Sequence, residues 1–184
     1  MISKEAIKRG YNRGNYVVGA HTPPAYAAAL TQTGSEPGLQ RDPVRLSAGQ
    51  IDALRHVADE VLTGTADVVA WTRDWWAGSM MSETGGKPAT PQAVIVKVST
   101  VEQVQAVMRI ASAQAIPLTV SAGRSNVTGA ALPVRGGIVL DVCQLNKLIG
   151  VDRESQIVEV EAGMFGDVFE QTIQDEYGLS LIHI

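Results

Sequence analysis

The chain has 184 residues, of which 45% are hydrophobic, and its formal net charge is −4. This length suits about one domain, and no stretch is apolar for the ~20 residues that a membrane-spanning helix needs. Lysine and arginine are scattered without a basic run, which disfavours a nucleic-acid-binding protein. The single cysteine, Cys143, excludes an intramolecular disulfide and a cysteine-rich metal site. The first residues lack the apolar core of a signal peptide, which predicts a cytoplasmic protein.

Residues 1–86 are expected to form a loop-rich and helical N-terminal region. Glycine and proline recur before residue 46, which is typical of irregular structure. A helix is predicted from Ser47, which can cap it while Gln50 completes a capping box. Gly64 is a plausible end for this helix. Its apolar residues recur at helical spacing: Ile51, Leu54, Val57, Ala58 and Val61.

All three tryptophans of the chain lie between Trp71 and Trp76. Aromatic clusters bury large areas, so we interpret this one as a packing surface in preference to a direct ligand contact. The polar, glycine-rich stretch 82–88 follows it. This composition predicts a linker, and the stretch is the best candidate for a domain boundary in the chain.

From residue 87 the pattern alternates between strands and helices. The β-branched run Ala93–Val98 predicts a strand, and Ser99 or Thr100 is placed to cap a helix that ends near residue 116. The apolar run Pro117–Val120 predicts a second strand. This strand–helix–strand unit leads us to expect a parallel pair with a right-handed crossover.

The remaining elements continue the mixed pattern. A strand is predicted at Ile138–Val142, and Gln156–Glu161 alternates as one strand of a hairpin that turns at Arg153–Ser155. A final helix is predicted after Gly166. The fold class is therefore α+β or α/β, with strands on both sides of the stretch Ser121–Pro133.

Ser121–Pro133 combines small residues, glycines, hydroxyl groups and one arginine. Such a backbone can turn sharply and point several N–H groups at one spot, which is how proteins hold phosphate oxygens. Ser125 and Thr128 can add hydroxyl donors, and Arg124 adds a permanent positive charge. The alternative is a tight turn that binds nothing, and the composition of the stretch leaves both interpretations open.

Spacing argues against three familiar motifs in this stretch. A P-loop needs glycines five apart followed by lysine, whereas Gly123 and Gly129 are six apart and Ala130 follows. A Rossmann fingerprint opens a helix, and Pro133 argues against one. The nucleophile elbow G-x-S-x-G fails at Val127, so a catalytic serine is disfavoured.

Five blocks of the chain stand in the order found in one known family. They are Pro91–Val104, Ile116–Val120, Ser121–Gly129, Gly136–Asp141 and Val158–Gly163. Together they resemble the first part of the FAD-binding domain of the vanillyl-alcohol oxidase superfamily, also called the PCMH-type domain. The resemblance implies an α+β fold in which residues 87–178 form the first α/β subdomain of an incomplete FAD-binding domain.

By this resemblance the loop lines the pyrophosphate of FAD. The implied cofactor-binding residues are Ser121, Ala122, Gly123, Arg124, Ser125, Asn126 and Gly129. Family members that link flavin covalently from this loop carry histidine where this chain has Arg124, so non-covalent FAD is expected. The three histidines, His21, His56 and His183, are interpreted as ordinary residues, and no metal site is expected.

The segments Arg73–Trp76 and Gly123–Gly129 resemble alkyl-dihydroxyacetonephosphate synthase-like proteins and are compatible with D-lactate and glycolate dehydrogenase-like proteins. The resemblance implies an FAD-dependent oxidoreductase for a small substrate such as a 2-hydroxy acid. One alternative is an alkylglycerone-phosphate synthase-like transferase, which would take a glycerone-phosphate ester. Another is a non-catalytic nucleotide-binding module.

The family's FAD domain continues beyond the last residue of this chain. We therefore expect a fragment of a longer enzyme, inactive by itself, whose catalytic residues lie elsewhere. Residues 179–184 coincide with the in-frame translation of a transposon end used in sequencing libraries. They are interpreted as an artefact, and a genuine short strand is the alternative.

Overall fold

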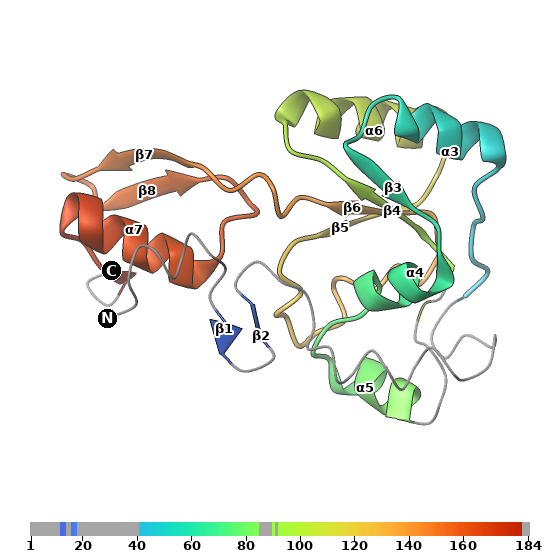
Figure 1. Ribbon diagram of the computed structural model, residues 1–184, viewed down its shortest axis with the longest axis horizontal. Coiled ribbons are helices and arrows are strands. Elements are labelled where there is room, and N and C mark those ends of the chain that lie inside the picture. The colour runs from blue at the N-terminus through green and yellow to red at the C-terminus, as the bar shows by residue number, and fades with distance from the viewer. Residues whose placement is uncertain (1–11, 14–15, 18–40, 85–89, 91, 182–184) are drawn as a thin grey trace.

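The computed structural model describes residues 12–13, 16–17, 41–84, 90 and 92–181, and a mixed sheet organises most of them (Figure 1). The four strands of this sheet lie in the order β3 (Glu60–Leu62), β4 (Val94–Lys97), β6 (Ile138–Asp141) and β5 (Leu118–Ser121). Strands β4, β6 and β5 are parallel, and β3 pairs antiparallel with β4.

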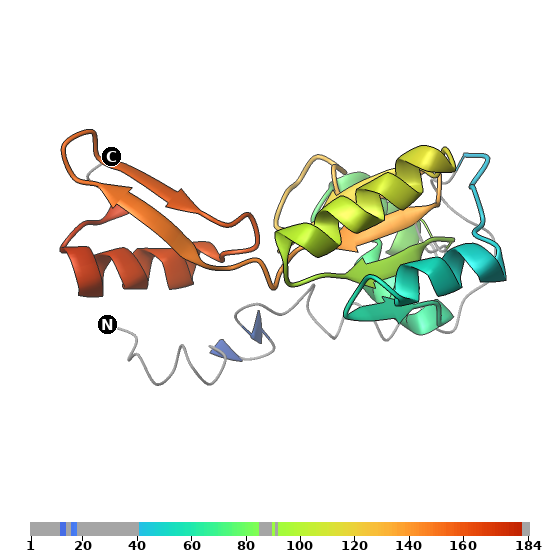
Figure 2. The ribbon, with the colours of Figure 1, turned by 90° about the horizontal axis from the view of Figure 1, so that it is seen from above.

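Helices pack on both faces of this sheet (Figures 1 and 2). Helices α3 (Ala48–Arg55) and α6 (Val101–Ala113) cover one face, and α4 (Thr65–Trp71) covers the other. The other described elements are β1 (Asn12–Arg13), β2 (Tyr16–Val17), α5 (Ala77–Thr84), β7 (Leu148–Asp152), β8 (Ile157–Val160) and α7 (Gly166–Tyr177). The expected combination of helices and strands is confirmed.

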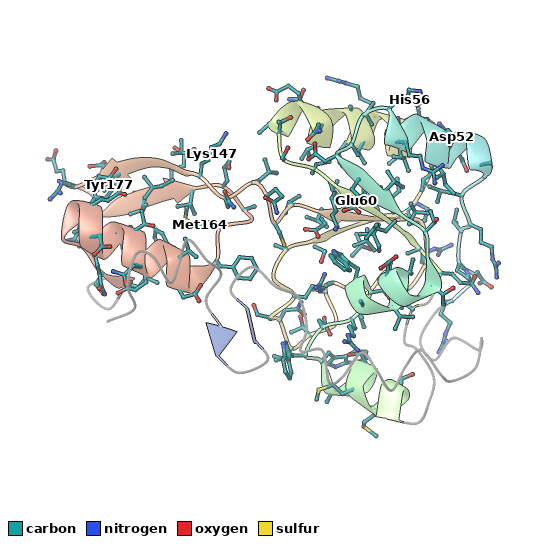
Figure 3. The ribbon with its side chains drawn as sticks, in the orientation of Figure 1. Asp52, His56, Glu60, Lys147, Met164 and Tyr177 are labelled. Atoms are coloured by element: carbon teal, nitrogen blue, oxygen red, sulfur yellow. The ribbon has the colours of Figure 1, made fainter. Side chains whose placement is uncertain are left out.

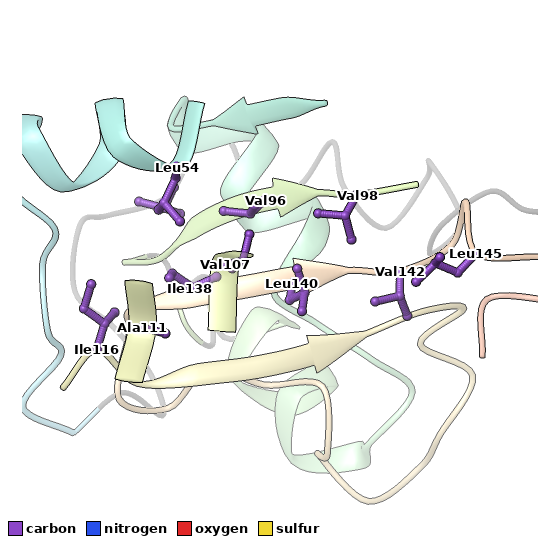
Figure 4. Packing of buried hydrophobic residues seen from close by; sticks show 11 residues of the cluster. Leu54, Val96, Val98, Val107, Ala111, Ile116, Ile138, Leu140, Val142 and Leu145 are labelled. Carbon is purple, nitrogen blue, oxygen red and sulfur yellow. The ribbon is translucent and has the colours of Figure 1, made fainter. Parts of the chain in front are cut away.

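The larger part of the core lies between the sheet and helices α3 and α6 (Figure 4). Alternate residues of β4 and β6 face these helices, because successive side chains of a strand point to opposite faces. Val96, Leu140 and Val107 are almost fully buried there. A smaller cluster of Val68, Ile95 and Val139 lies on the opposite face, beneath α4.

Both predicted helix starts are confirmed by their capping boxes. The Ser47 side chain accepts a hydrogen bond from the backbone N–H of Gln50, and the Gln50 side chain accepts one from the backbone N–H of Ser47. Thr100 and Gln103 make the same reciprocal pair at the start of α6. Each box satisfies backbone donors that a helix N-terminus otherwise leaves free.

The first helix ends earlier than its apolar spacing predicts. It ends at Arg55, and Val61 lies in β3 instead of in the helix. Val57, Ala58 and Val61 still pack against the main core. The apolar character of these residues therefore reflects their burial in the core. The local backbone conformation is determined by the pairing of β3 with the edge of β4.

The strand–helix–strand unit has a different neighbour relation from the expected one. Strands β4 and β5 are parallel to β6, but they do not pair with each other, because β6 lies between them. The expectation of a directly paired β4 and β5 was therefore wrong. The hydrophobic runs reveal each strand, whereas the order of strands depends on pairing between segments far apart in sequence.

The aromatic and linker predictions are also corrected in part. Trp75 and Trp76 are 42% and 36% exposed, so two of the three tryptophans are exposed, and Trp71 is half-buried. The predicted linker 82–88 begins inside α5, which extends to Thr84, and residues 85–88 lie outside the described part of the chain.

The hairpin of β7 and β8 and helix α7 form a second unit beside the main sheet (Figures 1 and 2). The hairpin turn is confirmed, and the Asp152 side chain accepts hydrogen bonds from the backbone N–H groups of Glu154 and Ser155. Helix α7 ends at Tyr177, and Gly178 follows with a φ of 65°. Glycine suits this left-handed C-terminal position.

Residues just beyond Gly178 bond to helix α7. The backbone N–H of Leu179 donates to the carbonyl of Ile173 at 3.1 Å, and that of Leu181 donates to the Glu170 carboxylate at 2.8 Å. Residues 182–184 lie outside the described part, so the interpretation of 179–184 as an artefact stays a prediction.

Candidate cofactor site

The loop predicted to bind a cofactor leaves the sheet at the carboxyl ends of its parallel strands. Ser121 ends β5 and lies opposite Asp141 at the end of β6, which in turn lies opposite Lys97 at the end of β4. Open sheets of this kind bind ligands at the carboxyl edge. No helix is formed between β5 and β6, as Pro133 predicted.

Hydrogen bonds within the loop hold much of its shape. The Asn126 side-chain oxygen accepts bonds from the backbone N–H groups of Thr128 and Ala130, both at 3.2 Å. The Asn126 carbonyl accepts a bond from the backbone N–H of Trp75 at 3.1 Å, which ties the loop to the segment between α4 and α5. Gly129 has a φ of 80° and lies against the Trp76 ring. In this structure Asn126 and Gly129 shape the loop.

A cavity of about 360 Å³ lies beside the loop. Ala122, Gly123 and Ser125 line one side of it, and residues 162–167 line the other. Figure 3 shows Met164, one of these residues, close to the start of α7. The cavity therefore has two walls that are about 40 residues apart in the sequence.

The second wall includes the N-terminus of α7. Phe165, the residue before this helix, makes no side-chain cap, and the Asp167 side chain accepts a bond from the backbone N–H of Val168. Free N–H groups and the helix dipole favour an anion at such an end. Because α7 has 12 residues and its first turn faces the small residues of the loop, the cavity can bind phosphate oxygens from two sides.

Close packing explains why one loop position is glycine. A Cβ atom at Gly123 would lie 3.1 Å from the Cε1 atom of Phe165, which is tighter than ordinary contact. The ring of Phe165 therefore packs directly on the loop backbone. Gly123 leaves room for both the ring and the cavity.

Arg124 does not line the cavity, although its neighbours Gly123 and Ser125 do. Its backbone φ is 51°, and its side chain is buried, with the guanidinium carbon 5.3 Å from the centre of the Trp71 ring. Burial lowers the pKa of Arg124 to about 10, and the negative charge of Asp141 opposes this shift. The guanidinium still carries its proton, and hence its positive charge, at neutral pH.

The one histidine among the described residues does not line the cavity. His56 is exposed at the end of α3, and His21 and His183 lie outside the described residues. A second cavity, of about 230 Å³, is lined by Val94 and Gly137 at the opposite ends of the strands. Within residues 41–84 and 92–181, no group of three or more histidine, cysteine or acidic side chains could hold a metal ion.

The structure thus brings together three of the seven predicted residues, namely Ala122, Gly123 and Ser125, around one cavity. Sequence reasoning missed the wall formed by residues 162–167. The signal was present, since Val158–Gly163 is one of the five ordered blocks and a helix was expected directly after it. The small walls and the helix N-terminus fit the diphosphate of a dinucleotide.

Comparison with known proteins gives independent support for a dinucleotide cofactor. The family described as FAD binding domain matches residues 91–182. A D-lactate dehydrogenase of Anaerostipes hadrus is 31% identical over 71 residues, which are 39% of this chain and 15% of that protein. A D-2-hydroxyglutarate dehydrogenase of Xanthomonas citri pv. viticola is 36% identical over 124 residues, which are 67% of this chain and 23% of that protein.

The fold also occurs in solved structures. A solved structure of alkyldihydroxyacetonephosphate synthase superposes with a TM-score of 0.65 and 20% identity, covering 79% of this chain and 29% of that one. The matches thus span less than a third of each of these longer proteins. None of the described helices has the length and apolarity needed to cross a membrane. Because the family match covers half of its residues, this chain belongs to the PCMH-type FAD-binding family, and its cofactor is FAD.

Proposed function

We propose that the cavity between residues 122–125 and residues 162–167 binds the diphosphate of FAD. The observation that carries this proposal is that the small residues of the loop face the uncapped N-terminus of α7 across one cavity. Backbone N–H groups from both walls can donate to phosphate oxygens, and the helix dipole favours their charge. Ala122 and Gly123 leave room for close approach, and the exposed Ser125 hydroxyl can donate a further bond.

We further propose that the protein acts as an FAD-dependent oxidoreductase on a small 2-hydroxy acid, without a covalent flavin link from this loop. FAD supplies the redox chemistry, and the protein binds and orients it. The D-lactate and D-2-hydroxyglutarate dehydrogenases among the relatives support this substrate class. By the family resemblance, Arg124 stands where a histidine would be needed for a link from the loop, and its side chain is buried against Trp71.

Two charge changes in the cavity test the binding site in opposite directions. Ser125→Asp places a carboxylate beside the diphosphate, and we expect the Kd for FAD to rise more than about tenfold. Asp167→Asn removes a carboxylate from the opposite wall, so we expect binding to tighten, most clearly at low salt. Both Kd values can be measured by titrating the isotope-labelled chain with FAD and following its amide signals by NMR.

Ser112→Asp serves as the matched control, because Ser112 is exposed on α6 and does not line the cavity. It makes the same chemical change and should leave the Kd for FAD near the wild-type value. Equal Kd values for Ser125→Asp and Ser112→Asp would refute the proposed site.

A transferase of the alkylglycerone-phosphate synthase type is the alternative for the whole protein. The two activities differ in their net electron balance. Anaerobic addition of D-lactate or D-2-hydroxyglutarate to the FAD-loaded whole protein should bleach the flavin absorption if that protein is a dehydrogenase. A flavin that stays oxidised with a panel of 2-hydroxy acids would contradict this substrate class.

A further inference from the structure

Burial of the Arg124 guanidinium costs desolvation free energy, and the packing of this side chain alone does not account for its burial. It is only 3% exposed, and its three guanidinium nitrogens have no hydrogen-bond partner among the described residues. Burying a charge without such partners is unfavourable. Its contact is the Trp71 ring, whose centre lies 5.3 Å from the guanidinium carbon.

The Trp71 ring is held in place from the strand ends. Its indole N–H donates a hydrogen bond to the Asp141 carboxylate at 2.5 Å, and the other Asp141 oxygen accepts one from the backbone N–H of Cys143 at 2.9 Å. Asp141 lies opposite Ser121, the last strand residue before the loop. The ring that contacts Arg124 is therefore anchored where the loop begins.

Lys97 is a second cation near the Trp71 ring, and unlike Arg124 it forms an ion pair within the described part of the chain. The Lys97 amino group lies 4.6 Å from the centre of the Trp71 ring, and it also forms an ion pair with Glu60 at 2.7 Å. Arg124 makes no ion pair of this kind with a described residue. The negative charge of Asp141 acts on Arg124 without forming such an ion pair, and Arg124 lies between Gly123 and Ser125, which both line the cavity.

We propose that Trp71 is a positioning residue for the FAD site, holding Arg124 so that the loop backbone and the guanidinium charge both favour the diphosphate. This inference rests on the proposed function. The ring contact fixes the left-handed backbone at Arg124, and this conformation directs the side chain to Trp71 while Gly123 and Ser125 face the cavity. In surroundings of low dielectric constant, the buried charge acts on the diphosphate with little screening.

Three variants separate positioning from simple packing. Trp71→Leu removes the ring, Trp71→Phe keeps a ring but removes the N–H bond to Asp141, and Arg124→Met keeps a long side chain without charge. Trp75→Leu is the control, since the Trp75 side chain is 42% exposed and does not line the cavity, and the variant keeps the backbone N–H that bonds to Asn126. For each variant, NMR titration of the 184-residue chain with FAD or ADP gives Kd, and thermal unfolding of the free chain checks folding.

We expect Trp71→Leu and Arg124→Met each to raise the Kd for FAD about tenfold, as expected for loss of one ring-held cation near an anion. The double variant should bind like either single one, because both changes remove the same interaction. Trp71→Phe should have a smaller effect, and Trp75→Leu none. In the free chain, the Arg124 Nε–H signal should lose its ring-current shift in Trp71→Leu and retain one in Trp71→Phe.

The outcomes separate this inference from the proposed function. If wild-type chain binds neither FAD nor ADP, the proposed function fails, and the positioning role fails with it even where the Arg124 signal confirms the ring contact. If wild type binds and a folded Trp71→Leu chain keeps its Kd, the positioning role is overturned. Should Trp71→Leu unfold, Arg124→Met decides alone, and an unchanged Kd there overturns the role. Fully additive losses in the double variant would also overturn it.

Discussion

Two adjacent residues of the loop that follows β5 have opposite environments. Ser125 is exposed and lines the cavity, whereas Arg124 is buried beneath the loop against Trp71. A residue with positive φ turns the chain so that its side chain departs from the side its neighbours face. The arginine is therefore suited to act through its charge and through the backbone shape it imposes, and Ser125 is suited to direct contact.

The environment of Cys143, next to Asp141, suppresses the reactivity of its thiol. Burial, followed by the negative charge of Asp141, raises the pKa of its thiol to about 12. Only the thiolate is a strong nucleophile. The thiol therefore stays protonated in the folded chain under conditions in which an exposed cysteine is ionised. Because its pKa is raised on folding, the protonated thiol contributes fully to the free energy of unfolding below the ordinary thiol pKa. This contribution is lost as pH rises toward 12.

We predict that Cys143 resists alkylation in the folded protein. At about pH 8.5, the ordinary thiol pKa, iodoacetamide should modify the folded chain far more slowly than the chain in denaturant. Mass spectrometry of the intact chain measures both rates. Similar rates in the two states would show that the thiol is neither buried nor protonated.

At the scale of elements, the segment before α7 matters as much as the helix. The backbone N–H of Gly163 donates to the Leu145 carbonyl at 2.7 Å, and this places residues 162–167 against the end of the sheet. A Cβ atom at Gly163 would lie 2.0 Å from the Val142 carbonyl oxygen. The Val142 backbone is itself bonded to Ser121, so this carbonyl has little freedom to move.

Gly163→Ala should therefore destabilise the protein by about 3 kcal/mol, because overpacking against backbone atoms is costly. Gly150→Ala is the matched control, since a Cβ atom there meets nothing within 4 Å. It should be neutral or should stabilise by ~0.4–1 kcal/mol through the unfolded state. Urea unfolding of the two variants compares them directly, and equal midpoints would contradict the close packing at Gly163.

At the scale of the whole molecule, the cavity lies between two units that the chain joins by short connections. The main sheet supplies the loop, and the unit of β7, β8 and α7 supplies the opposite wall. A ligand that bridges both walls stabilises the arrangement of the units as well as each unit, because it binds only the folded, assembled state.

We predict that FAD raises the stability of the chain and protects both walls together. At a hundred times its Kd, a ligand that binds only the folded state adds ~2.7 kcal/mol to the free energy of unfolding. Hydrogen exchange should slow at residues 122–125 and also at 163–167, and Ser125→Asp should weaken both effects at the same FAD concentration. Protection confined to one wall would mean that the ligand does not bridge the cavity.

Local features of this chain were predictable from the sequence by itself. The two capping boxes depend on residues three positions apart, and the absence of a helix after the loop depends on the nearby proline. The hydrophobic runs indicated the strands because burial leaves a periodic pattern. The ordered blocks indicated FAD, and the family match confirms it.

Only the tertiary structure decided which of these segments meet. It placed β6 between β4 and β5, ended the first helix at Arg55 to allow β3, and directed Arg124 to Trp71 and away from the cavity. It also brought the start of α7 to the loop. Each of these outcomes depends on contacts between residues far apart in the chain, and the free energy of such contacts leaves no local pattern in the sequence.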